Sequence, residues 1–151
     1  MSANHRVLLI VNPISGGNDK SSITKELRER LDSEKGELDI FYTTGINDKE
    51  KASEIIENYN PNRILIAGGD GSLKLIAEII RENSLPIGII PAGSANGLAE
   101  NLNLPSDLDE IVDVALGEHF VNLDCISIND EFCLHISDIG LNASLIKNYE
   151  E

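Results

Sequence analysis

Hydrophobic positions along the chain follow two periods that alternate as far as Gly117. Short runs of consecutive apolar residues are typical of strands that are buried on both faces of a parallel sheet. Stripes of apolar residues three or four positions apart are typical of helices with one buried face. The runs predict strands at residues 6–11, 63–67 and 86–90, and a strand at 38–44 is predicted because that stretch is rich in β-forming residues.

The stripes between these runs predict helices. They comprise Ile23, Leu27 and Leu31; Ala52, Ile55, Ile56 and Tyr59, followed by Asn60-Pro61; and Leu73, Ile76, Ala77 and Ile80. A further helix is expected to begin near Ser94, and Ser106 is expected to cap a helix that continues to Leu116. Because strands alternate with helices, the expected fold class is α/β, with three layers (α/β/α) and a mostly parallel sheet.

The pattern changes after residue 118. Residues 119–128 and 131–137 are two β-rich runs separated by Asn129-Asp130, which indicates a hairpin. The stretch at 141–149 has the pattern of a helix. We therefore expect an α/β domain at 1–118, followed by a hairpin and a helix at 119–151.

The chain of 151 residues carries 12 basic and 26 acidic side chains, a formal net charge of −14. Such a field repels nucleic acids and allows at most transient contact with anionic membranes. The acidic stretch at 48–57 is expected to be an exposed helix face. Cys125 and Cys133 predict neither a disulfide framework nor a zinc site. With no signal-peptide pattern and no membrane-length apolar run, the predicted location is cytoplasmic.

Three glycine-rich loops follow the first, third and fourth predicted strands, at residues 12–17, 68–72 and 91–97. In an open parallel sheet, ligands bind beyond the carboxyl ends of the strands, where these loops lie. Glycines there let backbone N–H groups approach an anion closely. Simpler interpretations stay open: an ordinary turn for the first loop, a helix cap for Asp70 and a capped helix start for Ser94.

Individual groups in these loops have chemistry suited to a phosphate ligand. The Ser15 hydroxyl is a hydrogen-bond donor, and the N–H of Gly93 is expected to face the same ligand. Asp70 is unusual, because a carboxylate beside a phosphate repels it unless the carboxylate takes a proton, binds a metal or orients a hydroxyl.

The motifs Asn12-Pro13-x-Ser15-Gly16, Gly68-Gly69-Asp70-Gly71-Ser72 and PAGSANGLA at 91–99 occur in this order. With this set the chain resembles the N-terminal half of the catalytic domain of the diacylglycerol kinase and sphingosine kinase family. The third motif is most similar to the sphingosine-kinase-like branch. The GGDG element alone is shared with NAD kinases and phosphofructokinases, whose sheet architecture is the one expected here.

The resemblance implies a kinase that transfers the γ-phosphoryl group of ATP to a lipid hydroxyl (diacylglycerol or a sphingoid-like lipid), with Mg²⁺ as cofactor. The residues it implies are Asn12, Pro13, Ser15 and Gly16 along the nucleotide; Thr43 or Thr44 near the adenine or ribose; Gly68, Gly69, Gly71 and Ser72 at the phosphates; and Gly93, Ser94 and Asn96, which complete the cleft. Asp70 is the implied acid/base, or a contributor to the magnesium network. No metal ligand is assigned.

Three positions depart from the family pattern. Leu75 and Asn142 stand where the family often has acidic residues, and Gly97 stands where the diacylglycerol branch often has Asp. Family members continue into a β-sandwich domain that closes over the lipid, so this chain alone is expected to be inactive. Two alternatives stay open: an NAD or sugar-phosphate kinase of the GGDG class, and a degenerate regulatory module that binds nucleotide without turnover.

Overall fold

The computed structural model describes residues 5–17, 19–81, 83, 85–129 and 131–134. Its elements in chain order are β1 (Arg6–Val11), a 3₁₀ turn (Ser15–Gly17), α1 (Ser21–Ser33), β2 (Glu37–Tyr42), α2 (Asp48–Tyr59), β3 (Arg63–Gly68), α3 (Asp70–Ile80), β4 (Ile87–Pro91), α4 (Gly97–Asn101), α5 (Leu108–Leu116), β5 (Ile126–Ile128) and β6 (Glu131–Cys133). The expected alternation of strands and helices is confirmed.

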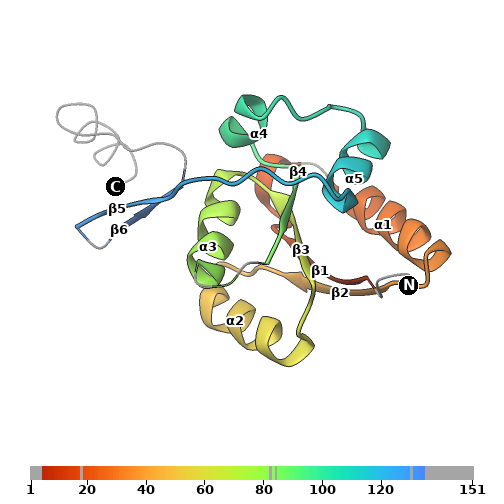
Figure 1. The fold of residues 1–151 in the computed structure, drawn as a ribbon, viewed down its shortest axis with the longest axis horizontal. Helices are drawn as coiled ribbons and strands as arrows, with labels where there is room; N and C mark the ends of the chain where they lie inside the picture. Colours follow the sequence, from red (N-terminus) through yellow and green to blue (C-terminus); the bar gives the residue numbers. More distant parts are fainter. Residues whose placement is uncertain (1–4, 18, 82, 84, 130, 135–151) are drawn as a thin grey trace.

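Strands β1 to β4 form one parallel sheet in the order β2-β1-β3-β4. The chain leaves β1 toward β2 on one side, then crosses to β3 and β4 on the other, so the direction of winding reverses between β1 and β3 (Figure 1). In sheets of this kind the crevice beyond the carboxyl ends at the reversal point is the usual ligand site. The topology therefore brings the loops after β1 and β3 together.

The core lies on both faces of the sheet because side chains alternate along each strand. On one face Val7, Leu9 and Val11 pack against α1 and α5. On the other, Leu8 and Ile10 pack against α2, α3 and Leu98 of α4. Figure 1 shows helices on either side of the sheet, which confirms the three-layer α/β/α architecture.

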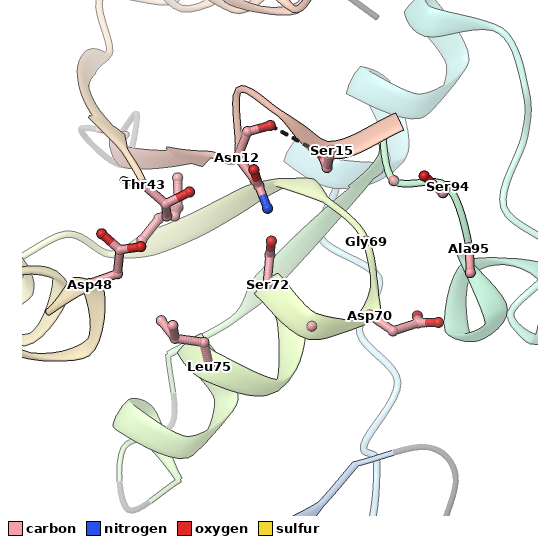
Figure 2. A pocket seen from close by; sticks show the side chains of 13 residues that line it. Asn12, Ser15, Thr43, Asp48, Gly69, Asp70, Ser72, Leu75, Ser94 and Ala95 are labelled. Carbon is pink, nitrogen blue, oxygen red and sulfur yellow. Dashed lines mark hydrogen bonds between the residues drawn. The ribbon is translucent and has the colours of Figure 1, made fainter. Parts of the chain in front are cut away.

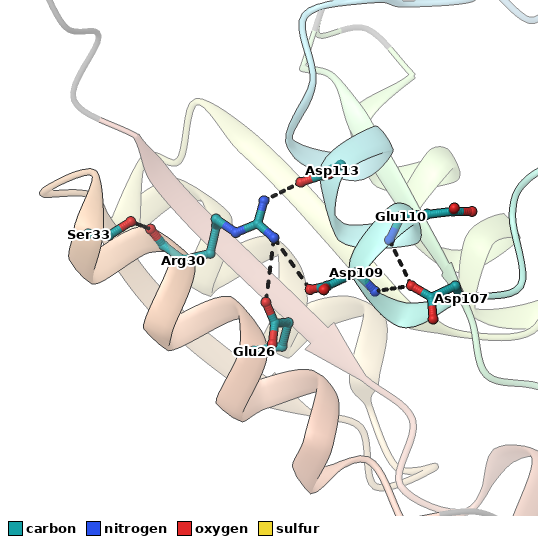
Figure 3. Close-up of polar contacts among 7 residues, drawn as sticks. All are labelled: Glu26, Arg30, Ser33, Asp107, Asp109, Glu110 and Asp113. Atoms are coloured by element: carbon teal, nitrogen blue, oxygen red, sulfur yellow. Dashed lines mark hydrogen bonds and ion pairs between the residues drawn. The ribbon is translucent and has the colours of Figure 1, made fainter.

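Helices α1 and α5, which cover the same face, are tied by Arg30 (Figure 3). Its guanidinium hydrogen-bonds the carboxylate of Asp113, and its other terminal nitrogen lies 3.5 Å from Asp109 and 3.6 Å from Glu26. The pair of helices supports β4 from this face, since α5 packs directly on that strand.

Two predicted helix starts are wrong. Asp107, not Ser106, caps α5: its Oδ1 accepts the N–H groups of Asp109 at 3.0 Å and Glu110 at 3.3 Å (Figure 3). A charged acceptor interacts more favourably with the positive end of the helix than a hydroxyl does. The helix expected near Ser94 is the short α4, and it begins only at Gly97.

The hairpin expected after residue 118 is confirmed but shorter. Strands β5 and β6 pair antiparallel, with Ile126 opposite Cys133 and Ile128 opposite Glu131. Residues 119–125 are not in a strand. Asn129 adopts the left-handed conformation (φ 49°) that the turn requires. The helix predicted at 141–149, and with it Asn142, lies outside the described residues.

Candidate functional site

A cleft of about 340 Å³ opens at the carboxyl edge of the sheet (Figure 2). Its lining comes from the end of β1, the loops after β1, β2, β3 and β4, the first residue of α2 and the first two turns of α3. The lining residues are Ile10, Asn12, Ser15, Thr43, Asp48, Gly69, Asp70, Gly71, Ser72, Leu75, Gly93, Ser94 and Ala95. The three glycine-rich loops therefore face one common space.

The first loop packs on the third. The Ser15 hydroxyl lies 2.9 Å from the carbonyl oxygen of Ala92 and 3.0 Å from that of Asn12. Gly16 has φ +63°, and a Cβ at this position would lie 2.7 Å from the Ala92 oxygen. Only glycine avoids both the strained backbone and this contact. The ordinary-turn interpretation of the first loop is therefore incomplete, because the loop forms part of a wall.

The second and third loops touch through their glycines. A Cβ on Gly93 would lie 2.4 Å from the Cα of Gly69, and a Cβ on Gly69 would lie 2.9 Å from the carbonyl oxygen of Ala95. The backbones thus approach more closely than any side chain permits. This contact sets the width of the cleft at the end next to α3.

The N-terminus of α3 supplies hydrogen-bond donors to this end of the cleft. The carbonyl oxygen of Gly69 accepts the N–H groups of Ser72 at 3.0 Å and Leu73 at 3.2 Å. Helix geometry leaves the N–H groups of Asp70 and Gly71 without an intrahelical acceptor. A Cβ on Gly71 would meet no atom within 4 Å, so this position is open. The helix end carries a partial positive charge and suits an anion.

The opposite end of the cleft is chemically different. Thr43, Asp48 and the apolar side chain of Leu75 lie there, away from Asp70 and Ser94 (Figure 2). Thr43 donates its N–H to the carbonyl oxygen of Val11 at 2.9 Å, which continues the β1–β2 pairing into the loop. An anionic ligand group is less favoured at this end, because the nearby N–H groups of Thr44 and Gly45 already donate to the Asp48 carboxylate.

Asp48 is held by the loop after β2. Its carboxylate accepts the N–H groups of Thr44 at 2.9 Å and Gly45 at 2.7 Å. Burial is the largest single influence and acts to raise the pKa of this carboxyl. The two amide donors, the Thr44 hydroxyl and the nearby Lys51 ammonium together outweigh burial, so the pKa lies below its ordinary value of 3.8. The prediction that 48–57 is an exposed helix face is therefore wrong for Asp48, which is 9% exposed.

Replacing Asp48 with Asn tests this arrangement through pH. A carboxyl with a lowered pKa stabilises the fold above the unfolded-state pKa, and this contribution is lost as pH falls through the folded-state pKa. We expect Asp48→Asn to lose about 1.5 kcal/mol at pH 7, with the difference from the original chain closing below about pH 4. Urea denaturation from pH 3 to 7 measures it. Asp32→Asn, on the exposed part of α1, is the control and is expected to change stability by less than about 0.5 kcal/mol. A gap that persists unchanged at pH 3 would contradict the assignment.

Asp70 points away from the apolar end of the cleft. Its Oδ2 accepts the N–H of Gly97 at 2.9 Å, and its Oδ1 accepts the N–H of Leu98 at 3.2 Å. Asn96 folds back on the third loop: its Oδ1 accepts the N–H of Gly93 at 2.9 Å, and its Nδ2 donates to the Gly93 carbonyl oxygen at 3.1 Å. This closed turn explains why α4 cannot begin near Ser94.

Most of the predicted site residues are brought together. Those that line the cleft are Asn12, Ser15, Thr43, Gly69, Asp70, Gly71, Ser72, Gly93 and Ser94. Those that do not line it are Pro13, Gly16, Thr44, Gly68 and Asn96; of these, Gly16, Thr44 and Asn96 make contacts that shape it. The expectation that the Gly93 N–H faces a ligand is wrong, because Asn96 accepts it.

Sequence reasoning missed Asp48, Ile10 and Ala95 as lining residues and used Leu75 only as a departure from a family pattern. A signal for Asp48 exists: it begins α2, three residues after Gly45, in the connection that follows β2. Among the described residues, no group of three or more His, Cys, Asp or Glu side chains is arranged to hold a metal ion. In the same part of the chain, no helix is both long and apolar enough to cross a membrane.

Comparison with known proteins relates the chain to one family of kinases. Residues 6–128 match the family model described as diacylglycerol kinase catalytic domain. The diacylglycerol kinase of Staphylococcus saprophyticus is 28% identical over 139 residues, which cover 89% of this chain and 45% of that protein. The diacylglycerol kinase of Staphylococcus carnosus is 27% identical over 137 residues, with the same coverage.

Similarity extends to three dimensions. A crystal structure of a diacylglycerol kinase from Bacillus anthracis str. Sterne superimposes with a TM-score of 0.70 and 25% sequence identity, over 85% of this chain and 47% of that one. The chain thus spans about half the length of the relatives it matches. Since the family model covers all four strands of the parallel sheet and each loop of the cleft, the chain belongs to the diacylglycerol kinase catalytic domain family.

Proposed function

We propose that this chain is the nucleotide-binding half of a kinase that transfers the γ-phosphoryl group of ATP to the hydroxyl of a lipid. The observation that carries the proposal is the single cleft into which the loops after β1, β3 and β4 converge. Family membership implies a phosphoryl donor such as ATP and a divalent metal. The two unlike ends of the cleft support an elongated ligand with one anionic end.

In this proposal the phosphates lie at the N-terminus of α3, where the N–H groups of Asp70 and Gly71 and the Ser72 hydroxyl stabilise negative charge. The nucleoside lies toward Thr43 and Asp48 over the apolar surface of Leu75. This orientation follows from the available donors: the first N–H groups of α3 have no intrahelical acceptor, whereas the Thr44 and Gly45 N–H groups at the other end already donate to Asp48.

The described residues fit the phosphates but do not by themselves form a metal site. The two carboxylates of the cleft, Asp48 and Asp70, accept backbone N–H groups, and no group of three or more potential ligands gathers in the described part of the chain. When bound, a magnesium ion would neutralise phosphate charge. The work of these residues is to bind and orient the nucleotide.

The proposal extends to the lipid acceptor. Because the chain spans about half of its relatives, the lipid with its free hydroxyl is proposed to be bound mainly by residues beyond the α/β domain. This chain alone is proposed to bind nucleotide without phosphorylating lipid. A cytoplasmic location and the division at residue 118 also remain predictions.

Calorimetric titration and thermal melting with ATP, tripolyphosphate and adenosine test the proposal. We expect ATP to bind with a Kd in the high-micromolar to millimolar range, about −4 to −6 kcal/mol. At about a hundred times the Kd, ATP would stabilise the fold by about 2.7 kcal/mol. Tripolyphosphate should bind more weakly than ATP, and adenosine more weakly still. Binding of adenosine alone, or no binding of any of the three, would contradict the phosphate assignment.

A further inference from the structure

We propose that Asp70 is a positioning residue whose carboxylate fastens the third loop to the second, rather than the group that exchanges a proton with the substrate. Its effect on nucleotide binding rests on the proposed function. The fastening itself does not, because it is defined by hydrogen bonds within the chain.

The geometry of Asp70 is that of a helix cap acting across the fold. Its two carboxylate oxygens accept the first two N–H groups of α4, from Gly97 at 2.9 Å and Leu98 at 3.2 Å. These residues are 27 and 28 positions away in the sequence. Figure 2 shows the carboxylate directed toward α4, whereas the hydroxyl of Ser72 is directed toward Asn12.

Helix α4 depends on this contact. It has five residues, and helices this short are marginal on their own. The residue at its own cap position, Asn96, makes no side-chain bond to the helix, because its amide group is used to close the turn on Gly93. The first N–H groups of a helix need an acceptor. Asp70 supplies it from α3.

The fastening decides where one wall of the cleft stands. Gly93, Ser94 and Ala95 line the cleft and lie between two fixed points. At one point Gly93 rests on the backbone of Gly69, and at the other Gly97 is bonded to Asp70. Loss of the second point would let this wall move while the first stayed in place.

The same geometry explains how the Asp70 carboxylate can lie beside the proposed phosphate site. Both oxygens face N–H donors at the start of α4, so the negative charge is directed to that helix end and away from the N–H groups at the start of α3. The two possible roles of Asp70 predict opposite effects for a neutral variant. If the Asp70 charge faced the phosphates, removing the charge would strengthen ATP binding. If the Asp70 carboxylate holds the third loop in place, removing the charge weakens ATP binding.

The experiment uses three variants of the chain. Asp70→Ala removes both acceptors, and Asp70→Asn keeps the shape and one acceptor. Asp107→Asn is the matched control, because Asp107 also accepts two N–H groups at a helix start but lies outside the cleft lining. Each variant removes one negative charge. Amide hydrogen exchange by NMR reports the Gly97 and Leu98 N–H groups, and calorimetric titration reports ATP affinity.

We expect Asp70→Ala to speed exchange at Gly97 and Leu98 by about tenfold or more and to weaken ATP binding by about tenfold, the size of a lost helix cap. Asp70→Asn should fall between Asp70→Ala and the original chain in both readouts. Asp107→Asn should lower the melting temperature without changing ATP affinity. Unchanged exchange in Asp70→Ala, or tighter ATP binding by Asp70→Asn, would overturn the proposal.

Failure of the proposed function gives a different result. If the original chain binds no ATP, calorimetric titration gives no heat for any variant and the proposed nucleotide site is wrong. Hydrogen exchange still tests the contact between Asp70 and α4. Faster exchange at Gly97 and Leu98 in Asp70→Ala supports this contact, and unchanged exchange refutes it.

Discussion

Gly93→Ala is expected to lower ATP affinity at least tenfold and to destabilise the fold by about 2–3 kcal/mol. The added Cβ would lie 2.4 Å from the Cα and 2.8 Å from the nitrogen of Gly69, and both atoms belong to backbone that begins a helix. No rotamer change relieves such a contact, so the second and third loops must separate. Urea denaturation measures the loss of stability, and calorimetric titration measures the loss of affinity.

Gly71→Ala is the matched control for this substitution. The same methyl group at Gly71 would meet no atom within 4 Å, although this position belongs to the same GGDG element as Gly69. Gly71 lies in the first turn of α3, where alanine favours the helix, so the free energy of unfolding should rise by up to about 1 kcal/mol. If both variants were equally stable, close contact between the two loops would not be what the glycine at position 93 provides.

The fold was predictable because its signals are local. Strands β1, β3 and β4 are short, mostly apolar runs, and β2 is rich in residues that favour strands. In β1, consecutive buried residues such as Leu8 and Leu9 face opposite sides of the sheet, as expected where helices cover both faces. The role of the second loop was also predictable. Three glycines in four residues cost conformational entropy on folding, so they are expected only where the backbone must approach another group closely. Topology then placed the loops together, because parallel strands end at one edge.

The errors concern interactions between residues far apart in sequence. The Gly97 N–H donates to the Asp70 carboxylate, 27 positions away in the sequence. The residues around Gly97 contain no pattern that predicts an acceptor from α3. Asp48 was assigned to an exposed face by its charged neighbours, yet the Thr44 and Gly45 amides draw it inward. Ser106 and Asp107 are both common caps, so propensity alone could not choose between them. Side-chain partners of this kind become visible only when the fold is known.

Arg63→Met is the second substitution with a large expected effect, a loss of about 2–4 kcal/mol in the free energy of unfolding. Arg63 begins β3 and is 7% exposed. Its Nη1 donates to the carbonyl oxygens of Ala115 at 2.6 Å and Gly117 at 2.8 Å, at the C-terminus of α5. Burial lowers the pKa of this guanidinium, with Glu118 opposing, but an arginine stays charged in proteins. Methionine keeps the apolar stem and leaves both carbonyl groups without this donor.

Arg6→Met separates this effect from the general loss of an arginine at the start of a strand. Arg6 begins the neighbouring strand β1, pairs with Glu37 at 3.2 Å and lies over the ring of Tyr59 at 4.8 Å. Its side chain is 37% exposed, so water replaces much of what is lost and the expected change is below about 1 kcal/mol. Equal losses in the two variants would contradict a special role for Arg63. A larger loss in Arg63→Met, measured by urea denaturation, would show that the C-terminus of α5 is held by a buried cation. Because α5 packs on β4, the same anchor supports the strand that carries the third loop into the cleft.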